Sequence, residues 1–240
     1  MVDNLISENI PREIRELNQW VAWQGERKSN GKMTKRPVNP LTGKYARTND
    51  PSTWGSFDEA VSSSEKYGLH GVGFVFSADD AYAGIDLDGC LDSETGVLSP
   101  EAHEILETFG SYVEVSPSGE GLHVFVKGRL PEGGRKKGKV EVYDRGRFFT
   151  VTGNRLPDTP AGIHDRADTL TEFYHKHFPS GPWEKPLTVI PRDTEEGRIP
   201  RGKSQEDFIR DNKEDHGRND AALIERAMAA RNGEDFRRLW

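Results

Sequence analysis

Two aspartates in the segment 83–89 are the first residues whose types and spacing suggest chemistry. The segment reads Ala-Gly-Ile-Asp-Leu-Asp-Gly, so Asp86 and Asp88 are two positions apart. Side chains alternate along a β-strand, so both carboxylates would share one face, opposite Ile85 and Leu87. Aspartate is a poor strand former, and like charges this close repel each other unless a cation lies between them. Because carboxylates are the ligands that Mg²⁺ and Mn²⁺ prefer, the pair predicts a metal site, although a solvated strand end often carries the same bare pattern.

A serine- and glycine-rich segment, residues 116–123, is the second candidate. It reads Ser-Pro-Ser-Gly-Glu-Gly-Leu-His. Gly119 and Gly121 permit a tight turn around Ser118, in which backbone N–H groups can approach phosphate oxygens. His123 follows on a predicted strand whose apolar residues face the core, so its imidazole faces the opposite, uncovered side. Taken alone, such a turn is often only a hairpin, and such a histidine is a surface or packing residue.

A third segment, Val140–Tyr143, carries Glu141 between two valines that would face the core. Glu141 then lies on the same side as His123 and the two aspartates. Each feature alone has a plain structural explanation, but three strand segments that place acids or a histidine on one face favour a shared site. Nucleotidyl transfer requires such a set, because two divalent ions held by acidic strands activate the attacking hydroxyl and clamp the phosphorus.

The distribution of charge is more informative than its sum. The net charge of −7 argues by itself against phosphate binding. Basic residues are nevertheless concentrated in residues 26–47 and 129–139, and on an acidic body two such segments would form a positive groove for single-stranded DNA. Solvated loops explain each segment equally well in isolation. The candidates within these segments are Lys35 and Arg36, then Arg135, Lys136 and Lys137.

The elements that must position these residues follow from periodicity. Strands are predicted at residues 20–23, 72–76, 82–88, 112–115, 122–127, 140–143 and 147–152, the last hairpinned to its predecessor. Helices are predicted at residues 11–17, 57–67 and 100–109, and around Leu170–Tyr174. This pattern predicts an α+β fold, in which a mostly antiparallel sheet carries helices on one face.

The composition also divides the chain into segments. Residues 1–180 are expected to form one domain, the proline-punctuated and charged residues 181–218 a linker, and residues 219–240 a short helical extension that begins an incomplete helical domain. The single cysteine, Cys90, excludes an internal disulfide and a multi-cysteine zinc site. Without an apolar run of about 18 residues or a secretory signal, we expect a soluble, cytoplasmic protein with no membrane partner.

Taken in order, the aspartate pair, Ser-Gly-x-Gly-x-His and the glutamate-led strand resemble the archaeo-eukaryotic primase superfamily. The match is best to the primase-polymerase branch of phages, plasmids and mobile elements, the bifunctional DNA primase/polymerase N-terminal domain. The segments Trp20–Trp23, Lys35–Pro37, Pro51–Trp54 and Phe57–Ala60 also look like that branch, and residues 232–240 are similar to the opening of its helix-bundle domain. Each motif is weak alone, whereas their ordered combination over nearly the whole chain is fairly specific.

The resemblance implies a fold, a site and an activity. The fold would be an RRM-like half joined to a smaller N-terminal α/β half, and residues 1–180 would be the catalytic domain. Two Mg²⁺ or Mn²⁺ ions, and no zinc, would be held by Asp86, Asp88 and Glu141. His123, with Ser118, Gly119 and Gly121, would contact the phosphates of the incoming dNTP or NTP, and Lys35 or Arg36 would reach the triphosphate. For His123, direct ligation of metal is the alternative.

The implied enzyme is a DNA primase and DNA polymerase, that is, a nucleotidyltransferase, acting on a single-stranded DNA template. It would serve the replication of a phage, a plasmid or an integrated mobile element, where a replicative helicase is a conceivable further partner. One rival is a non-catalytic module that binds single-stranded DNA by stacking bases on exposed aromatic residues such as Phe125. Acids on the same face disfavour that reading, since they repel phosphate without metal. A metal-dependent nuclease, with water as nucleophile, is the other rival.

Overall fold

The structure is a computed structural model that describes residues 5–27, 33–133 and 135–178 of the 240-residue chain. The described residues belong to the first of two units, Met1–Glu184 and Lys185–Trp240. Nearly all of the predicted linker, residues 181–218, and all of the predicted helical extension, residues 219–240, fall in the second unit and outside the described residues. Among the described residues, no helix has the length and apolar character needed to cross a membrane.

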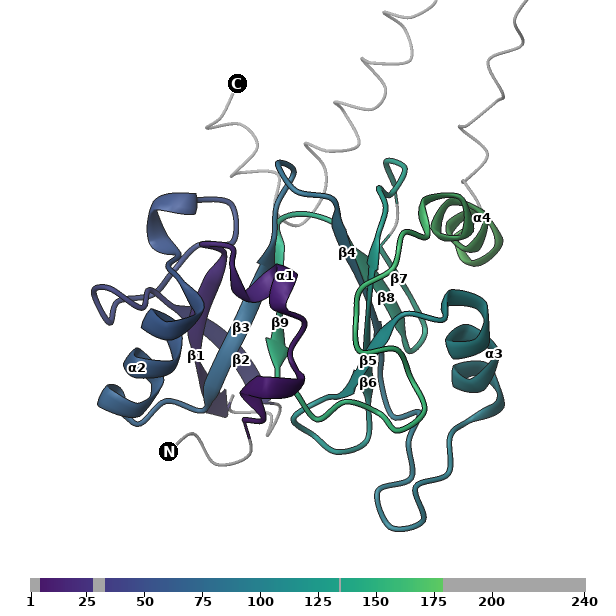
Figure 1. Cartoon of the computed structure of the whole chain (residues 1–240), viewed down its shortest axis with the longest axis horizontal. Coiled ribbons are helices and arrows are strands. Elements are labelled where there is room, and N and C mark those ends of the chain that lie inside the picture. Colours follow the sequence, from purple (N-terminus) through teal and green to yellow (C-terminus); the bar gives the residue numbers. More distant parts are fainter. Residues whose placement is uncertain (1–4, 28–32, 134, 179–240) are drawn as a thin grey trace, which may run out of the picture. The chain divides into compact units, whose positions relative to one another are not determined.

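Two antiparallel sheets form the centre of the first unit (Figure 1). Sheet A has the strand order β2 (Met33–Val38), β1 (Trp20–Arg27), β3 (Gly71–Phe76) and β9 (Arg147–Val151). Sheet B has the order β5 (Tyr112–Val115), β6 (Leu122–Lys127), β4 (Tyr82–Leu87), β8 (Val140–Tyr143) and β7 (Lys136–Lys137). The helices are α1 (Arg12–Arg15), α2 (Phe57–Tyr67), α3 (Pro100–Phe109) and α4 (Ala167–His177). The predicted α+β class is therefore confirmed.

The helix ends follow the local signals in the sequence. Ser56 and Glu59 form a reciprocal capping box at the start of α2, and Gly68 ends that helix with a φ of +60°. Ser99 caps α3 by accepting a hydrogen bond from the backbone N–H of Ala102, and Gly110 ends it in the left-handed region. These caps satisfy backbone groups that a helix end otherwise leaves without partners.

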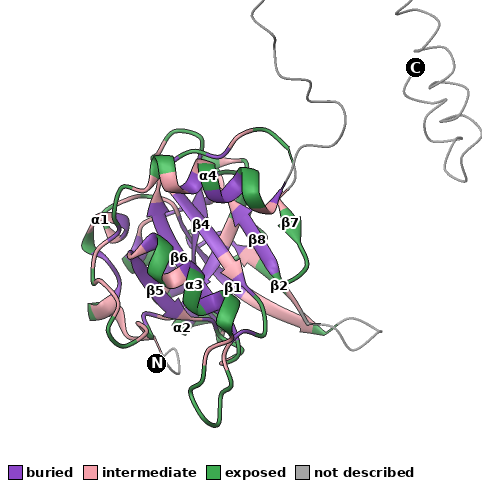
Figure 2. Cartoon of the chain, turned by 90° about the vertical axis from the view of Figure 1, so that its right-hand side faces the viewer, coloured by how far each residue is buried: buried purple, intermediate pink, exposed green. Residues whose placement is uncertain are grey.

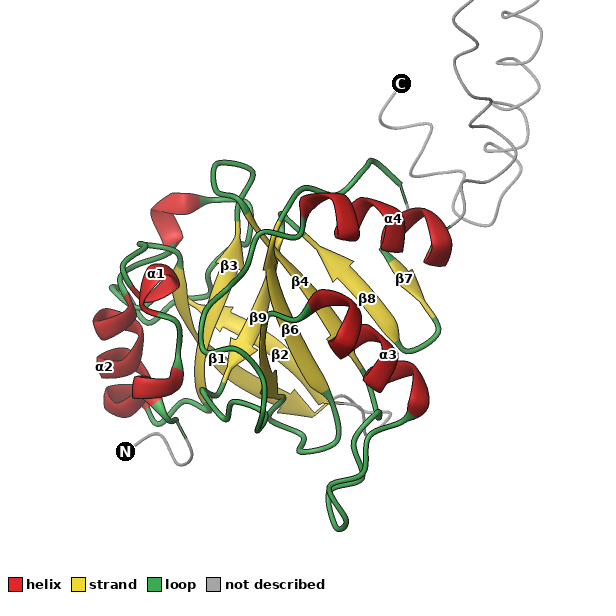
Figure 3. Cartoon of the chain, turned by 45° about the vertical axis from the view of Figure 1, so that its right-hand side comes forward, coloured by secondary structure: helices red, strands yellow, loops and turns green. Residues whose placement is uncertain are grey.

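Helices α3 and α4 cover the side of sheet B that faces away from sheet A (Figures 1 and 3). The alternate apolar residues of the sheet B strands, such as Ile85, Val124 and Val142, pack there against Ile105 of α3 and Leu170 of α4. In Figure 2 the central strands are largely buried, while exposed residues lie on the outer sides of the helices and in loops. The apolar face that was predicted from the alternation is therefore the face that the helices bury.

One predicted strand lies in a different sheet from the one expected. Residues 147–152 were predicted to pair with the preceding strand, but β9 pairs with β3 in sheet A. The reason is that both edges of β8 are already used, one by β4 and the other by the short strand β7. The chain therefore crosses between the sheets after β8, and β9 brings Phe149 up against sheet B, while Phe148 faces the opposite side of sheet A.

The two sheets pack closely against each other at Gly84 of β4. A Cβ atom at this position would overlap the rings of Phe76 and Phe149, which come from sheet A. These two rings pack edge to face, with centroids 4.9 Å apart, and belong to the same apolar cluster as Phe125 of β6. A glycine is therefore required here for packing between the sheets rather than for backbone freedom.

Replacing Gly84 by alanine should destabilise the fold by about 1–3 kcal/mol, because the aromatic rings must shift to admit the methyl group. Gly162→Ala is the matched control, since a Cβ atom at Gly162 meets no atom within 4 Å. The measurement is the free energy of unfolding in urea for both variants. Equal stability of the two variants would contradict this account of the sheet packing.

Candidate active site

One side chain from each strand of sheet B falls in a single cross-strand row. The register pairs Glu114 of β5 with His123 of β6, His123 with Asp86 of β4, Asp86 with Glu141 of β8, and Glu141 with Lys136 of β7. Directly opposed residues of antiparallel strands have Cβ atoms about 4.5–5.5 Å apart. The register therefore brings three residues of the predicted site, Asp86, His123 and Glu141, side by side.

Asp86 occupies the middle of this row. Its Oδ1 lies 3.8 Å from Nε2 of His123, and its side chain keeps 24 % of its exposure. Burial raises the pKa of Asp86, as do the nearby carboxylates of Asp88 and Glu141, while His123 and Lys35 oppose the rise. Asp88 is exposed and follows β4 directly. The charge of Asp86 is thus only partly compensated by its neighbours, an environment that favours an added cation.

Glu141, by contrast, is surrounded by donors. Its carboxylate pairs with the ammonium group of Lys136 and accepts hydrogen bonds from the hydroxyl of Tyr143, at 2.8 Å, and from Arg147, at 3.3 Å. Burial alone would raise the pKa of Glu141, but the contacts with Lys136, Tyr143 and Arg147 lower it overall. Glu141 is therefore held ionised by positive side chains.

The chemistry of the predicted ligands fits a hard divalent cation, because Asp86, Asp88 and Glu141 offer only carboxylate oxygens. In the part of the chain that the structure describes, however, no three acidic, histidine or cysteine side chains are grouped closely enough to hold an ion. The carboxylate of Glu141 is directed to Lys136 and Arg147. Ligation by all three acids requires Glu141 to exchange Lys136 for the ion, and the metal assignment stays a prediction.

His123 lies on the predicted face of the sheet, but that face is not open. The residue is 3 % exposed, and its ring stacks on Phe149 of sheet A, with centroids 4.8 Å apart. Phe125 is fully buried on the same face, so it is not available as a platform for bases. The expectation of an uncovered face was wrong because strand alternation shows which side a residue faces but not what packs against that side.

Lys35 and Arg36 were both predicted near the triphosphate, and the structure brings Lys35 toward the aspartates. Nζ of Lys35 is 3.2 Å from the hydroxyl of Thr150. Burial of this ammonium group lowers the pKa of Lys35, and the charges of Asp86 and Asp88 act in the opposite direction. Arg36 is engaged elsewhere: its Nε lies 2.9 Å from Glu26, and its guanidinium group lies over the ring of Tyr45.

The predicted phosphate-binding turn joins β5 to β6, the two strands that carry Glu114 and His123. Gly119 has a φ of +79°, and a Cβ atom at Gly121 would lie 2.9 Å from the carbonyl oxygen of Leu87, so both glycines are required. The hydroxyl of Ser118 is 3.0 Å from that of Ser116 and accepts the backbone N–H of residue 120. Among the described residues, no hydrogen bond or ion pair joins Ser118 to the cross-strand row.

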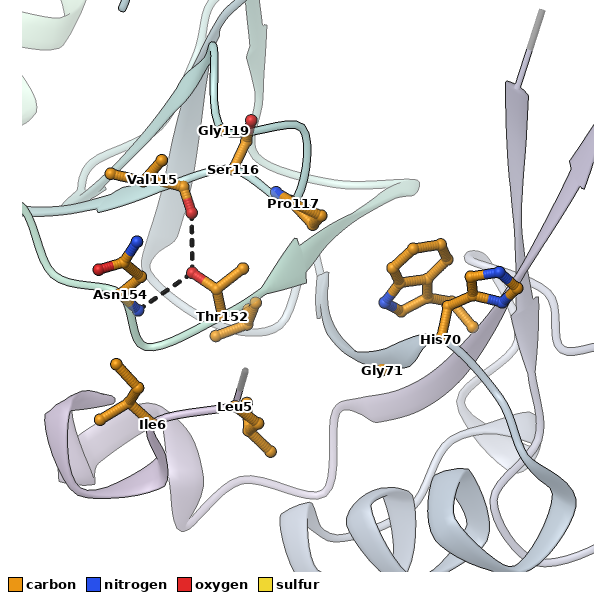
Figure 4. A pocket seen from close by; sticks show the side chains of 12 residues that line it. Leu5, Ile6, His70, Gly71, Val115, Ser116, Pro117, Gly119, Thr152 and Asn154 are labelled. Carbon is orange, nitrogen blue, oxygen red and sulfur yellow. Dashed lines mark hydrogen bonds between the residues drawn. The ribbon is translucent and has the colours of Figure 1, made fainter. Parts of the chain in front are cut away.

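The turn borders a pocket of about 560 Å³ (Figure 4). Ser116, Pro117 and Gly119 line one side of the pocket, and Trp23 and His70 line another. The rings of Trp23 and His70 are stacked, with centroids 5.2 Å apart. The lining of the pocket thus combines the serine and glycine turn with a stacked pair of rings.

The three basic residues predicted to bind DNA differ in their surroundings. Arg135 donates to the carbonyl of Pro131 at 2.7 Å, and Lys136 is paired with Glu141. Lys137 is exposed. Two of the three are therefore engaged within the fold, and their contact with DNA stays a prediction.

Sequence reasoning missed two residues of this site, Glu114 and Arg147. Glu114 lies between two valines on β5, and the same signal had identified Glu141 on β8. Arg147 was expected at the start of a strand of sheet B, and its contact with Glu141 arises because β9 belongs to sheet A and faces that carboxylate.

No protein-family model matches the chain. Over 141 residues the chain is 44 % identical to a DNA primase-polymerase of Nitratiruptor phage NrS-1. The chain is related to a phage-type primase-polymerase. This relationship confirms the resemblance that the ordered motifs indicated. The matched region covers 56 % of this chain and 19 % of the phage protein, so the similarity concerns a small part of that relative.

The contrast between Lys35 and Arg36 gives a direct test. Lys35→Ala should weaken the binding of a nucleoside triphosphate about tenfold, the scale of one lost charged hydrogen bond, because its ammonium group faces the aspartates. Arg36→Ala, the matched control, should leave binding unchanged, since Arg36 is paired with Glu26. The dissociation constant is measured by titrating a fluorescent deoxynucleotide in the presence of Mn²⁺. Equal losses in both variants would show that Lys35 has no special position.

Proposed function

We propose that this chain carries out template-directed nucleotidyl transfer on single-stranded DNA, the activity of a DNA primase and polymerase. The observation that carries the proposal is the cross-strand row, in which Asp86 lies between His123 and Glu141. The relative of this chain, a phage DNA primase-polymerase, supports the same activity. The natural setting would be the replication of a phage, a plasmid or an integrated mobile element.

Residues of the row and their neighbours would have separate roles in this reaction. Asp86, Asp88 and Glu141 would hold Mg²⁺ or Mn²⁺, which when bound lowers the pKa of the attacking 3′-hydroxyl and stabilises charge on the phosphate. Lys35 would bind the phosphates of the dNTP or NTP from sheet A, and His123 from sheet B. Phe149 stacks on the His123 ring and excludes water from that side.

The burial of Phe125 bears on the choice between functions. A module that binds single-stranded DNA without catalysis needs exposed aromatic rings for stacking, and Phe125 was the candidate on this face. Its ring is fully buried between the sheets. The partly exposed carboxylate of Asp86 at the centre of the row supports the proposed metal chemistry instead. A nuclease would use the same acids with water as the nucleophile, and it would shorten a labelled primer rather than extend it.

Asp86→Asn should abolish primer extension on a single-stranded template with either Mg²⁺ or Mn²⁺. The melting temperature should be unchanged or higher, because the substitution removes a charge that burial disfavours. Asp158→Asn is the matched control, since Asp158 is exposed and its φ of 61° suits asparagine equally well. Extension is followed on a gel with a labelled primer and each nucleotide type. Normal extension by the Asp86 variant would exclude the proposed mechanism.

Affinity for single-stranded DNA should fall as salt rises, although the chain is acidic overall. Lys137→Ala should reduce the slope of log affinity against log salt by roughly 1, the value for one lost phosphate contact. Replacing Arg135, Lys136 and Lys137 together should flatten it further. Lys176→Ala is the control, because Lys176 is exposed on α4 and paired with Glu104. An unchanged slope in the triple variant would mean that this segment does not touch DNA.

A further inference from the structure

Glu114 is a completely buried carboxylate that the proposed chemistry leaves without a role. Its side chain is 0 % exposed. Oε1 accepts the backbone N–H of Thr152 at 3.1 Å, and Oε2 accepts both the backbone N–H of Gly153 and the hydroxyl of Tyr112, each at 3.0 Å. A carboxylate has about four acceptor positions, two on each oxygen. Oε2 is therefore saturated, whereas Oε1 has one position left.

The remaining acceptor position faces His123. Oε1 of Glu114 lies 3.5 Å from Nδ1 of His123, its direct cross-strand neighbour. Nδ1 is buried and has no hydrogen-bond partner among the described residues. A buried ring nitrogen without a partner is costly, so the unused acceptor and the unpartnered nitrogen complement each other. The separation exceeds an ordinary hydrogen bond by a few tenths of an ångström, which a small rotation of the ring removes.

We propose that Glu114 is a positioning residue for His123. It accepts the proton on Nδ1 and thereby holds the ring with Nε2 directed to Asp86, the side on which the substrate would bind. Phe149 fixes the plane of the ring by stacking, but stacking alone does not prevent a half-turn that exchanges the two ring edges. Glu114 supplies the polar contact that distinguishes the two orientations.

The arrangement also connects the two sheets. Thr152 and Gly153 directly follow β9 of sheet A, and their backbone N–H groups hold the carboxylate in place. The orientation of His123 in sheet B thus depends on the end of a strand in sheet A. The role of the ring at the phosphates rests on the proposed function, whereas the Glu114–His123 contact does not.

The first test needs neither nucleotide nor metal. In protein labelled with ¹⁵N-histidine, the His123 resonances are assigned by their loss in His123→Ala, and Nδ1 should carry a proton. In Glu114→Ala, which removes the acceptor, a smaller fraction of His123 should carry the proton on Nδ1, because this ring nitrogen no longer has a partner. An unprotonated Nδ1 in the unmodified protein, or an unchanged Nδ1 resonance in Glu114→Ala, overturns the proposal.

The second test asks whether the contact matters for substrate. Glu114→Ala should raise the KM for dATP in primer extension about tenfold with a smaller change in kcat, because the ring is no longer held. Tyr112→Phe is the matched control: it removes a hydrogen bond from Oε2 and lowers the melting temperature, but it leaves Oε1 and the KM unchanged. If the KM rises in both variants in proportion to their loss of melting temperature, the role of Glu114 is purely structural and the proposal is refuted. If the unmodified protein extends no primer, the proposed function fails, and the Nδ1 measurement still decides the role of Glu114.

Discussion

The arrangement of this molecule depends on the register of sheet B. Asp86 is paired with His123 on one side and with Glu141 on the other, and the same row continues to Glu114 and Lys136 at the edges. A slip of one residue in any pair would turn that strand's polar side chain toward α3 and α4. The apolar residues of the opposite face prevent such a slip, because the helices bury them. The core on one side of the sheet therefore fixes the site on the other side.

The charges of the row are compensated in different ways, which gives each acid a different character. The carboxyl group of Glu114 accepts hydrogen bonds from backbone N–H groups and a hydroxyl, whereas Glu141 is paired with two positive side chains. The pKa of Asp86 is raised, chiefly by burial, and the opposing effects of His123 and Lys35 do not cancel the rise. Buried ionised groups are tolerated where such partners exist. An added cation would therefore be stabilised most beside Asp86, at the centre of the row.

The packing of sheet A on sheet B decides how accessible the row is. Gly84 lets Phe76 and Phe149 lie close to β4, and Phe149 in turn covers His123. Sheet A also contributes Lys35 and Arg147, which approach the acids from across the interface. The site is therefore made by both sheets, although its acids and histidine all belong to one of them.

The sequence alone was sufficient for the α+β class, for strands β4, β5, β6 and β8 of sheet B but not for β7, for the helix caps at Ser56 and Ser99, and for the shared face of Asp86, His123 and Glu141. These features follow from local periodicity and from capping chemistry, which act over a few residues. Tertiary structure decided the rest. Contacts between residues far apart in the chain decide that β9 pairs with β3 and that Phe149 covers His123. Such contacts also give the neighbouring side chains of Lys35 and Arg36 different partners, Thr150 and Glu26. Alternation determines the side to which a residue points, but only the packed fold determines what it meets there.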